Sequence, residues 1–492
     1  MSKHKGKKAK NESNSQKARR AQRKKQKKGS SKLIPALVVV LALGIGGYFA
    51  WPHITPAPTV VQPSSDTNLD PAVDALLTKL VATAEQNPKE ATAHAALALA
   101  YEANGLWGEA QKSYTQAIKL NSGERDWHLH QAVVARQNGD FESALATLKK
   151  HAPKHPKYAP LQNHYGDALL EAGEIDEAEE VFRNLISIAP GAAQGYVGLG
   201  DILIQQGNGE EAVQNLEEAV KKSPNYKQAH YLLGRAYTLV GRNEEAEASL
   251  ARGSGAEIEY MLDPLYQQME EYTVNATGRI NLASKYLNSG NPQRAAKLLE
   301  ETYSYHNTNV MLLNTLASAY LRTQRLDDAR RLLDRAKGLD EDQFFTYLNL
   351  YSWALRAQKK DEALGFAQQA VVHAPDRDDT HLAVAQSLTE MNRLEEALVS
   401  AQKAVEIDGN KGNNVGMLGD ILLRLERYDE AEVFLQRALA LDSGLLPAIV
   451  GLAQAKWELG DYTTARNLLR RAQQIAPNHP RVQEVANKFN AG

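Results

Sequence analysis

An alanine returns every 34 residues through most of this 492-residue chain. The interval is broken once, between Ala246 and Ala295, where it is 49 residues. The column consists of Ala110, Ala144, Ala178, Ala212, Ala246, Ala295, Ala329, Ala363, Ala397, Ala431 and Ala465. A constant period of about 20 to 50 residues indicates stacked supersecondary units. The chain is therefore predicted to be a repeat protein with two registers separated by one insertion.

Other positions keep the same phase as the alanines. A small residue usually stands twelve positions before each alanine, a glycine often five before, and a large apolar residue usually four after. Apolar residues at i, i+3, i+4 and i+7 predict two amphipathic helices in each unit, and the glycine predicts the turn between them. Small residues let antiparallel helices cross closely. Because one hairpin cannot cover its own apolar face, neighbouring hairpins must stack.

This pattern resembles the tetratricopeptide repeat, a helix-turn-helix unit of 34 residues. The resemblance implies an all-α, right-handed superhelical α-solenoid. It places five repeats in residues 91–260 and six in residues 276–479, with a degenerate leading half-repeat over 69–90 and a C-terminal capping helix over 480–492. Residues 261–275 are expected to form an irregular insert. A packing helix, a hinge and a docking segment all remain open for this insert.

The first 68 residues lie outside the repeats. Residues 1–32 contain 14 Lys and Arg and one acid, Glu12, which predicts a disordered basic arm. Residues 33–51 carry no charge and are long enough to cross a bilayer as a helix. Residues 52–68 hold four prolines, which predicts an extended linker.

These N-terminal features predict a location. We expect a single N-terminal transmembrane helix with the basic arm in the cytoplasm, since positive residues resist translocation. The arm would contact anionic lipid, and the repeat body would lie in the periplasm of a bacterial inner membrane. We do not expect nucleic-acid binding, because the arm has no aromatic residue to stack on bases.

No catalytic, cofactor or metal site is expected. The chain has no cysteine, which excludes thiol catalysis, disulfides and Cys-ligated metal sites. The 13 histidines are dispersed and are expected on ordinary surface positions or helix faces. His128 and His130 are two residues apart on a helix, so their side chains should point away from each other. We therefore expect a protein that is not an enzyme.

The resemblance implies that the first helix of each unit lines an inner groove for protein or peptide partners. The polar residues expected in the groove of the first five repeats are Asn163, Asp167, Glu171, Gln194, Asp201 and Gln205. In the last six repeats the charged residues expected there are Arg322, Arg356 and Arg424. The first half should then favour basic or polar segments and the second half acidic ones. Pairing of the arginines with nearby carboxylates is an equally open alternative.

The function implied by the resemblance is that of a membrane-anchored scaffold. Such a scaffold would bind protein partners and help to assemble an envelope complex for polysaccharide export, envelope assembly or cytochrome maturation. An organelle import receptor with cytosolic repeats is one alternative. A second alternative is an enzyme or the regulatory subunit of a membrane enzyme, with its activity near the insert.

Overall fold

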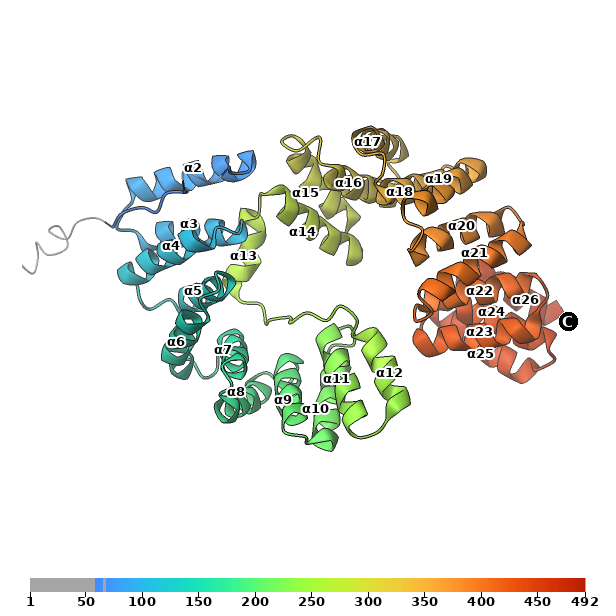
Figure 1. Cartoon of the computed structure of the whole chain (residues 1–492), viewed down its shortest axis with the longest axis horizontal. Helices are drawn as coiled ribbons and strands as arrows, with labels where there is room; N and C mark the ends of the chain where they lie inside the picture. Colours follow the sequence, from blue (N-terminus) through green and yellow to red (C-terminus); the bar gives the residue numbers. More distant parts are fainter. Residues whose placement is uncertain (1–57, 65–67, 492) are drawn as a thin grey trace, which may run out of the picture. The chain divides into compact units, whose positions relative to one another are not determined.

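The structure is a computed structural model that describes residues 58–64 and 68–491. Within these residues the chain forms 25 α-helices and no strand. Most consecutive helices are joined by short turns. From α2 to α12 and again from α14 to α26 each helix packs against its neighbours in the chain, whereas α13 packs on α3 (Figure 1). The prediction of an all-α solenoid of helix hairpins is confirmed for this part of the chain.

The helices fall into two arrays of pairs. The first array has α3 (Ala91–Ala103) with α4 (Trp107–Leu120), α5 (Arg125–Gln137) with α6 (Phe141–His151), α7 (Ala159–Glu171) with α8 (Ile175–Ile188), α9 (Gln194–Gln205) with α10 (Gly209–Lys222), and α11 (Lys227–Leu239) with α12 (Asn243–Arg252). The second array has α14 (Ala276–Asn288) with α15 (Pro292–Tyr303), α16 (Val310–Arg322) with α17 (Leu326–Leu339), α18 (Phe344–Arg356) with α19 (Lys360–His373), α20 (Asp378–Glu390) with α21 (Leu394–Ile407), α22 (Gly412–Arg424) with α23 (Tyr428–Leu441), and α24 (Leu446–Glu458) with α25 (Tyr462–Ile475). The remaining elements are α2 (Pro71–Gln86), the short 3₁₀ turn η1 (Ala152–Lys154), α13 (Pro264–Tyr272) and α26 (Pro480–Ala491).

The expected location in a membrane must be corrected. No helix in residues 58–64 and 68–491 is long and apolar enough to cross a bilayer, which contradicts the expected single-pass protein with a periplasmic body. The longest of these helices, α2, has 16 residues and spans roughly 24 Å, against about 30 Å for a hydrocarbon core. Residues 33–51, for which the span is expected, lie outside the described residues, as do the arm 1–32 and most of the linker 52–68.

The repeating alanines lie inside the helix pairs. All eleven are buried. Some neighbouring small positions are glycines because a bulky side chain occupies the space beside them. A Cβ on Gly166 would lie 2.7 Å from the ring of Phe182, and one on Gly198 would lie 2.3 Å from the same ring. Phe182 of α8 is fully buried and thus fills the gap between α7 and α9.

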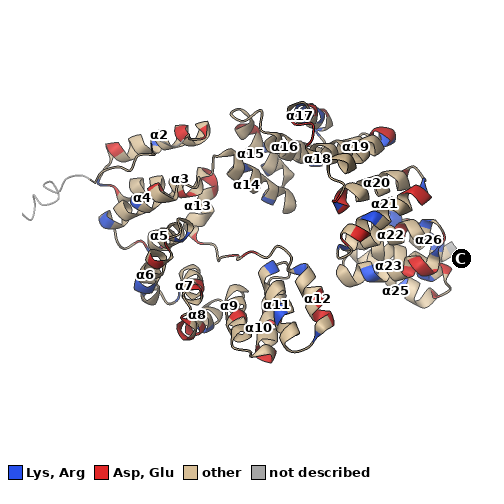
Figure 2. Cartoon of the chain, in the orientation of Figure 1, with Lys and Arg blue, Asp and Glu red and all other residues tan. Residues whose placement is uncertain are grey.

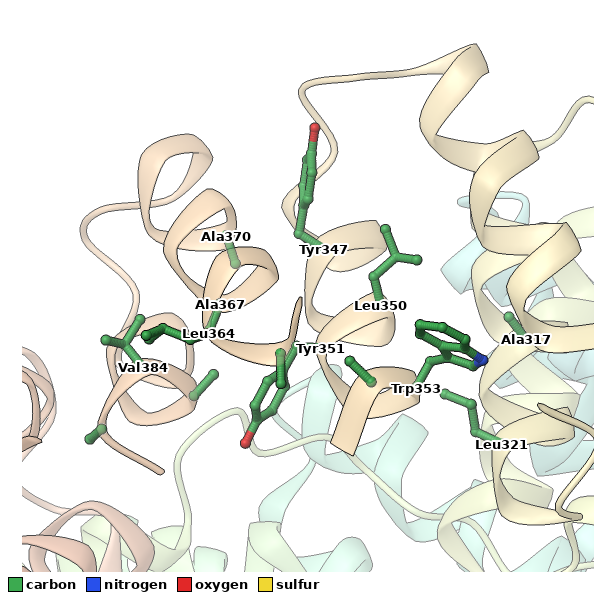
Figure 3. Packing of buried hydrophobic residues seen from close by; sticks show 14 of the residues in the cluster. Ala317, Leu321, Tyr347, Leu350, Tyr351, Trp353, Leu364, Ala367, Ala370 and Val384 are labelled. Atoms are coloured by element: carbon green, nitrogen blue, oxygen red, sulfur yellow. The ribbon is translucent and has the colours of Figure 1, made fainter. Parts of the chain in front are cut away.

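The core of the second array continues from repeat to repeat. Buried side chains from α14 to α24 form one cluster. Figure 3 shows the indole of Trp353 on α18 directed at Ala317 and Leu321 of the preceding α16. The Trp353 Nε1 also donates a hydrogen bond to the carbonyl of Leu326, at 3.1 Å. Each repeat is therefore stabilised mainly by its neighbours, as in other linear arrays.

The turn inside a pair requires a left-handed residue. Seven pairs use glycine there, with φ near +80°, for example Gly105 and Gly460. Four successive pairs of the second array instead place a side chain in this conformation, at Gln324, Gln358, Asn392 and Glu426. The turn geometry is thus kept where the glycine is missing, at some cost in backbone strain.

Enlarging an alanine of the buried column should destabilise the array. Ala212 and Ala397 are fully buried, so leucine at either position must push two helices apart. We expect Ala212→Leu and Ala397→Leu each to lower the free energy of unfolding by about 1–3 kcal/mol, measured by urea denaturation. The matched controls Glu210→Leu and Glu395→Leu place the same side chain at exposed positions. Equal midpoints for buried and exposed variants would contradict the packing described here.

Candidate functional site

A groove runs along the first helices of the first array. Its lining side chains come from α5, α7, α9 and α11, from the residue before α11 and from the segment before α13, and they are Arg136, Asn163, Asp167, Leu170, Glu171, Gln194, Val197, Gly198, Asp201, Tyr226, Gln228, Leu232 and Ile258. Five of the six polar residues expected in this groove are among them. The sixth, Gln205 at the end of α9, is not. Arg136 and Tyr226 were not predicted as groove residues.

The chain itself lies in this groove. Residues 256–263, here called the crossing segment, have no regular secondary structure and lead from α12 to α13 (Figure 1). The Gln194 side chain donates to the carbonyl of Glu259 at 3.2 Å, and the Glu259 N–H donates to the Tyr226 hydroxyl at 3.1 Å. The Met261 N–H donates to Asn163 Oδ1 at 3.1 Å. The groove therefore binds the main chain of this segment.

Tyr260 is the aromatic anchor of the crossing segment. Its ring stacks on His164 of α7, with centroids 3.9 Å apart and planes 9° apart. Its hydroxyl accepts a hydrogen bond from Arg136, which also pairs with Glu171. Burial lowers the pKa of His164 to about 3, with His130 and Arg136 adding to the effect, so this ring is neutral at pH 7. Tyr260 thus lies between a neutral aromatic platform and a guanidinium.

His130 is the centre of a buried charged cluster. It is 2% exposed, and its two carboxylate partners, Glu102 and Asp263, are 3% and 5% exposed. His130 Nδ1 lies 2.8 Å from Glu102 Oε2, and Nε2 lies 3.0 Å from Asp263 Oδ1. Burial alone would lower the pKa of His130, but the two carboxylates outweigh it and raise the pKa to about 10. A charged imidazolium therefore joins α3 and α5 to the end of the crossing segment.

The expectation that the histidines lie on ordinary surface positions or helix faces is thus wrong for His130. Its partners are 28 and 133 residues away in the chain, so no local spacing indicates them. Asp263 also accepts hydrogen bonds from the N–H groups of Leu265, at 2.8 Å, and Tyr266, at 3.1 Å. It is the N-cap of α13, which explains why the helix begins directly after it.

Helix α13 is held on the first array by Asn104, which follows α3. The Asn104 amide donates to the carbonyl of Tyr272 at 2.8 Å, and its oxygen accepts from the N–H groups of Val274 and Asn275 at 3.1 Å. The Ala276 N–H, at the start of α14, donates to Asp70 Oδ2 at 3.1 Å. The insert therefore consists of an extended segment in the groove followed by a short helix packed on α3.

A second groove lies in the second array, with a volume of about 740 Å³. Side chains of α20, α22, α24 and α26 line it, including Gln386, Glu390 and Met417. Arg424 lies here and pairs with Asp420 at 3.2 Å. Arg481 of α26 binds the same carboxylate, which is buried. For Arg424 the structure therefore shows the second alternative, in which the arginine pairs with a nearby carboxylate.

The other two arginines of the second array differ from Arg424. Arg322 donates to the carbonyl of Leu287 at 2.6 Å, and Arg356 donates to the carbonyl of Ser352 at 3.3 Å. Both are exposed, and neither forms an ion pair with any residue in the described ranges. Neither is among the residues that line the second groove. Basic and acidic residues occur on the helices of both arrays (Figure 2).

The sequence of the hairpins matches two family models, both described as tetratricopeptide repeat. One matches residues 95–159 and 165–226, and the other matches 203–269, 286–353 and 422–488. Together these matches cover more than half of the chain. The chain belongs to the tetratricopeptide repeat family.

Several solved structures resemble this tetratricopeptide repeat protein. Yeast Tom70 is 16% identical, with 82% of this chain and 95% of that chain covered and a TM-score of 0.37. The Cut9–Hcn1 hetero-tetramer of the APC/C is 12% identical, covering 78% and 93%, with a TM-score of 0.41. PilF of Pseudomonas aeruginosa is 15% identical, covering 43% and 96%, with a TM-score of 0.38. These are likenesses of fold alone, and no curated protein sequence matches the chain.

The chemistry available in the two grooves is that of recognition. The grooves of this tetratricopeptide repeat protein contain amide and hydroxyl groups that bind a peptide main chain. They also contain an aromatic platform, buried carboxylates and arginines. Among residues 58–64 and 68–491, no three His, Asp or Glu side chains are grouped so that they could hold a metal ion.

Proposed function

We propose that this protein is a scaffold that binds an extended, acidic segment of a protein partner along the first helices of its second array. One difference between the arrays supports the proposal. Asn163, Gln194 and Arg136 of the first groove are bound to the crossing segment, whereas Arg322 and Arg356 keep their charge unpaired within the described part of the chain.

The spacing of the charged positions defines which partner segment would fit. Arg322, Arg356, Glu390 and Arg424 are the last residues of the first helices in four successive repeats. An arginine guanidinium can hold a carboxylate with two parallel hydrogen bonds. We therefore expect the partner segment to place carboxylates opposite Arg322 and Arg356. A basic or polar residue fits opposite Glu390. Arg424 is already paired with Asp420, which it shares with Arg481.

Charge reversal at the two unpaired arginines tests this proposal. The double variant Arg322→Glu with Arg356→Glu should weaken binding of a fluorescent Asp- and Glu-rich peptide at least about tenfold, because one charge-assisted hydrogen bond is worth about 1.5–3 kcal/mol. Binding is measured by fluorescence anisotropy, against the same peptide with Asn and Gln in place of the acids.

The matched control is Arg437→Glu with Arg470→Glu. These arginines lie on the second helices α23 and α25 and are exposed. The control changes the net charge equally and should leave the affinity unchanged. Equal loss in both double variants, or no loss in the first, would contradict the assignment of the site.

The narrower role implied by the family resemblance, in assembling an envelope complex, remains a prediction. A photo-cross-linking residue at Ser352 or Gln386, introduced into the full chain in its native cell, would capture the partner. A cross-link that maps to an extended acidic segment of the captured protein is the expected outcome. A cross-link to a folded, basic surface would count against the proposal.

A further inference from the structure

The first groove carries a site that the proposed function does not use. We propose that it is a second peptide-binding site, held closed by the crossing segment, whose ligand in trans is an extended peptide with an aromatic residue followed three positions later by a carboxylate. No residue of the second array contributes to this site.

The groove recognises the main chain of the segment that it binds. Three side chains of the groove bind the crossing segment through its main chain and not through its side chains. They are Asn163, Gln194 and Tyr226, and their partners are main-chain atoms of Glu259 and Met261. Asn163 is oriented by a hydrogen bond to Asp167 Oδ2, at 3.0 Å. Because every extended peptide offers the same N–H and carbonyl groups, a peptide in trans could form these bonds equally well.

The aromatic position gives the first element of specificity. His164 offers a flat, neutral ring to the Tyr260 ring, and the adjacent guanidinium of Arg136 donates to the hydroxyl. Stacking of this kind with a polar contact at the end of the ring favours tyrosine over an aliphatic residue.

The carboxylate position gives the second element. His130 and Glu102 belong to the array itself and are almost completely buried. When Asp263 leaves, the imidazolium loses one of its two carboxylate partners in a site from which water is largely excluded. A buried charge without its partner is costly, so a ligand that replaces the crossing segment must bring a carboxylate of its own.

The crossing segment buries few of its own side chains. Asp263 is its only buried residue, and the large side chains Ile258 and Leu262 are 47% and 57% exposed. Helix α13 after it has no buried residue. Met261 packs partly against the core of the first array, as do Leu265 and Tyr272 of α13. Release of the segment breaks these contacts but leaves the helix pairs intact, and local opening of this kind requires less free energy than global unfolding. Covalent attachment gives the segment a high effective concentration, which keeps the groove closed when no ligand is present.

The test opens the groove in the full chain. Residues 256–263 are replaced by a Gly-Ser linker of the same length, and the probe is a fluorescein-labelled peptide with the sequence of residues 255–266, GAEIEYMLDPLY. The peptide should bind the linker variant at least tenfold more tightly than the wild type. Peptides carrying Tyr260→Ala or Asp263→Asn should bind at least tenfold more weakly than the unmodified peptide. Arg136→Ala in the linker variant should also reduce binding.

A second measurement avoids dependence on the folding of the linker variant. A protease that cleaves after glutamate should cut the wild-type chain at Glu257 and Glu259 slowly, and excess peptide in trans should accelerate the cleavage by displacing the segment. The proposal is overturned if the linker variant binds the peptide no better than the wild type does, or if a scrambled peptide binds equally well. Cleavage that does not respond to the peptide would also overturn it. Both assays are repeated in the Arg322→Glu, Arg356→Glu background, in which the second array should no longer bind acidic peptides. The same differences are expected there, which separates this site from that of the second array.

Discussion

Replacing His130 with alanine is expected to lower the free energy of unfolding by about 3–5 kcal/mol. The substitution removes the cation that both carboxylates share. It leaves Glu102 and Asp263 buried with no positive charge between them. It also removes the contact that holds the start of α13. Urea denaturation followed by circular dichroism measures the loss. His230→Ala is the matched control, because His230 is equally buried but bonds only to the carbonyl of Pro224, at 2.8 Å.

The effect of His130 should depend on pH in a defined direction. The pKa of His130 is about 10 in the folded chain against an ordinary value of 6.5. A raised pKa means that the stabilisation is complete below about pH 6.5 and is lost as the pH rises towards 10. The difference in stability between wild type and His130→Ala should therefore narrow over this range. A difference that is constant from pH 6.5 to 10 would show that the imidazolium is not the stabilising species.

Replacing Phe182 with alanine is the second change with a large expected effect, a loss of about 3–5 kcal/mol in the free energy of unfolding. The ring is fully buried and is packed against Gly166 and Gly198, which have no side chain to fill the space it would leave. A cavity must therefore remain between α7 and α9. Thermal or urea unfolding of the purified variant measures the loss.

A double-mutant cycle makes this test specific. In the wild type, Gly198→Ala would place a Cβ 2.3 Å from the Phe182 ring and should destabilise the chain by about 1–3 kcal/mol. In the Phe182→Ala background the same methyl enters the cavity, so the double variant should be more stable than the sum of the two losses predicts. Strict additivity would show that the two positions do not share one space.

The fold could be predicted because its signal is local and repeated. Helix pairs of constant length place Ala110 and its equivalents at the same depth in every unit, so packing imposes a phase on the sequence. Close packing of the helices also explains why Gly166 and Gly198 stand beside a phenylalanine. The left-handed turns at Gln324, Gln358, Asn392 and Glu426 show that a glycine column can lapse without changing the backbone.

The filled groove could not be predicted in this way. Its contacts join residues far apart in the chain, 98 positions for Asn163 and Met261 and 133 for His130 and Asp263, and they occur once. Main-chain atoms of Glu259 and Met261 form three of the bonds, and main-chain atoms leave no mark on the sequence. The repeat pattern predicts that Asn163 and Gln194 lie in the groove. It does not predict that a segment of the same chain already binds them. The role of Arg136 could not be predicted because its partner Tyr260 lies 124 residues away in the chain.

Hydrogen exchange at the amides of Glu259 and Met261 tests most directly whether the first groove is occupied by its own chain. Their N–H groups donate to Tyr226 and Asn163, so they should exchange at least tenfold more slowly than in the free peptide of residues 255–266. Protection of Met261 should be lost in Asn163→Ala. Exchange at the rate of the free peptide in the wild-type protein would contradict an occupied groove.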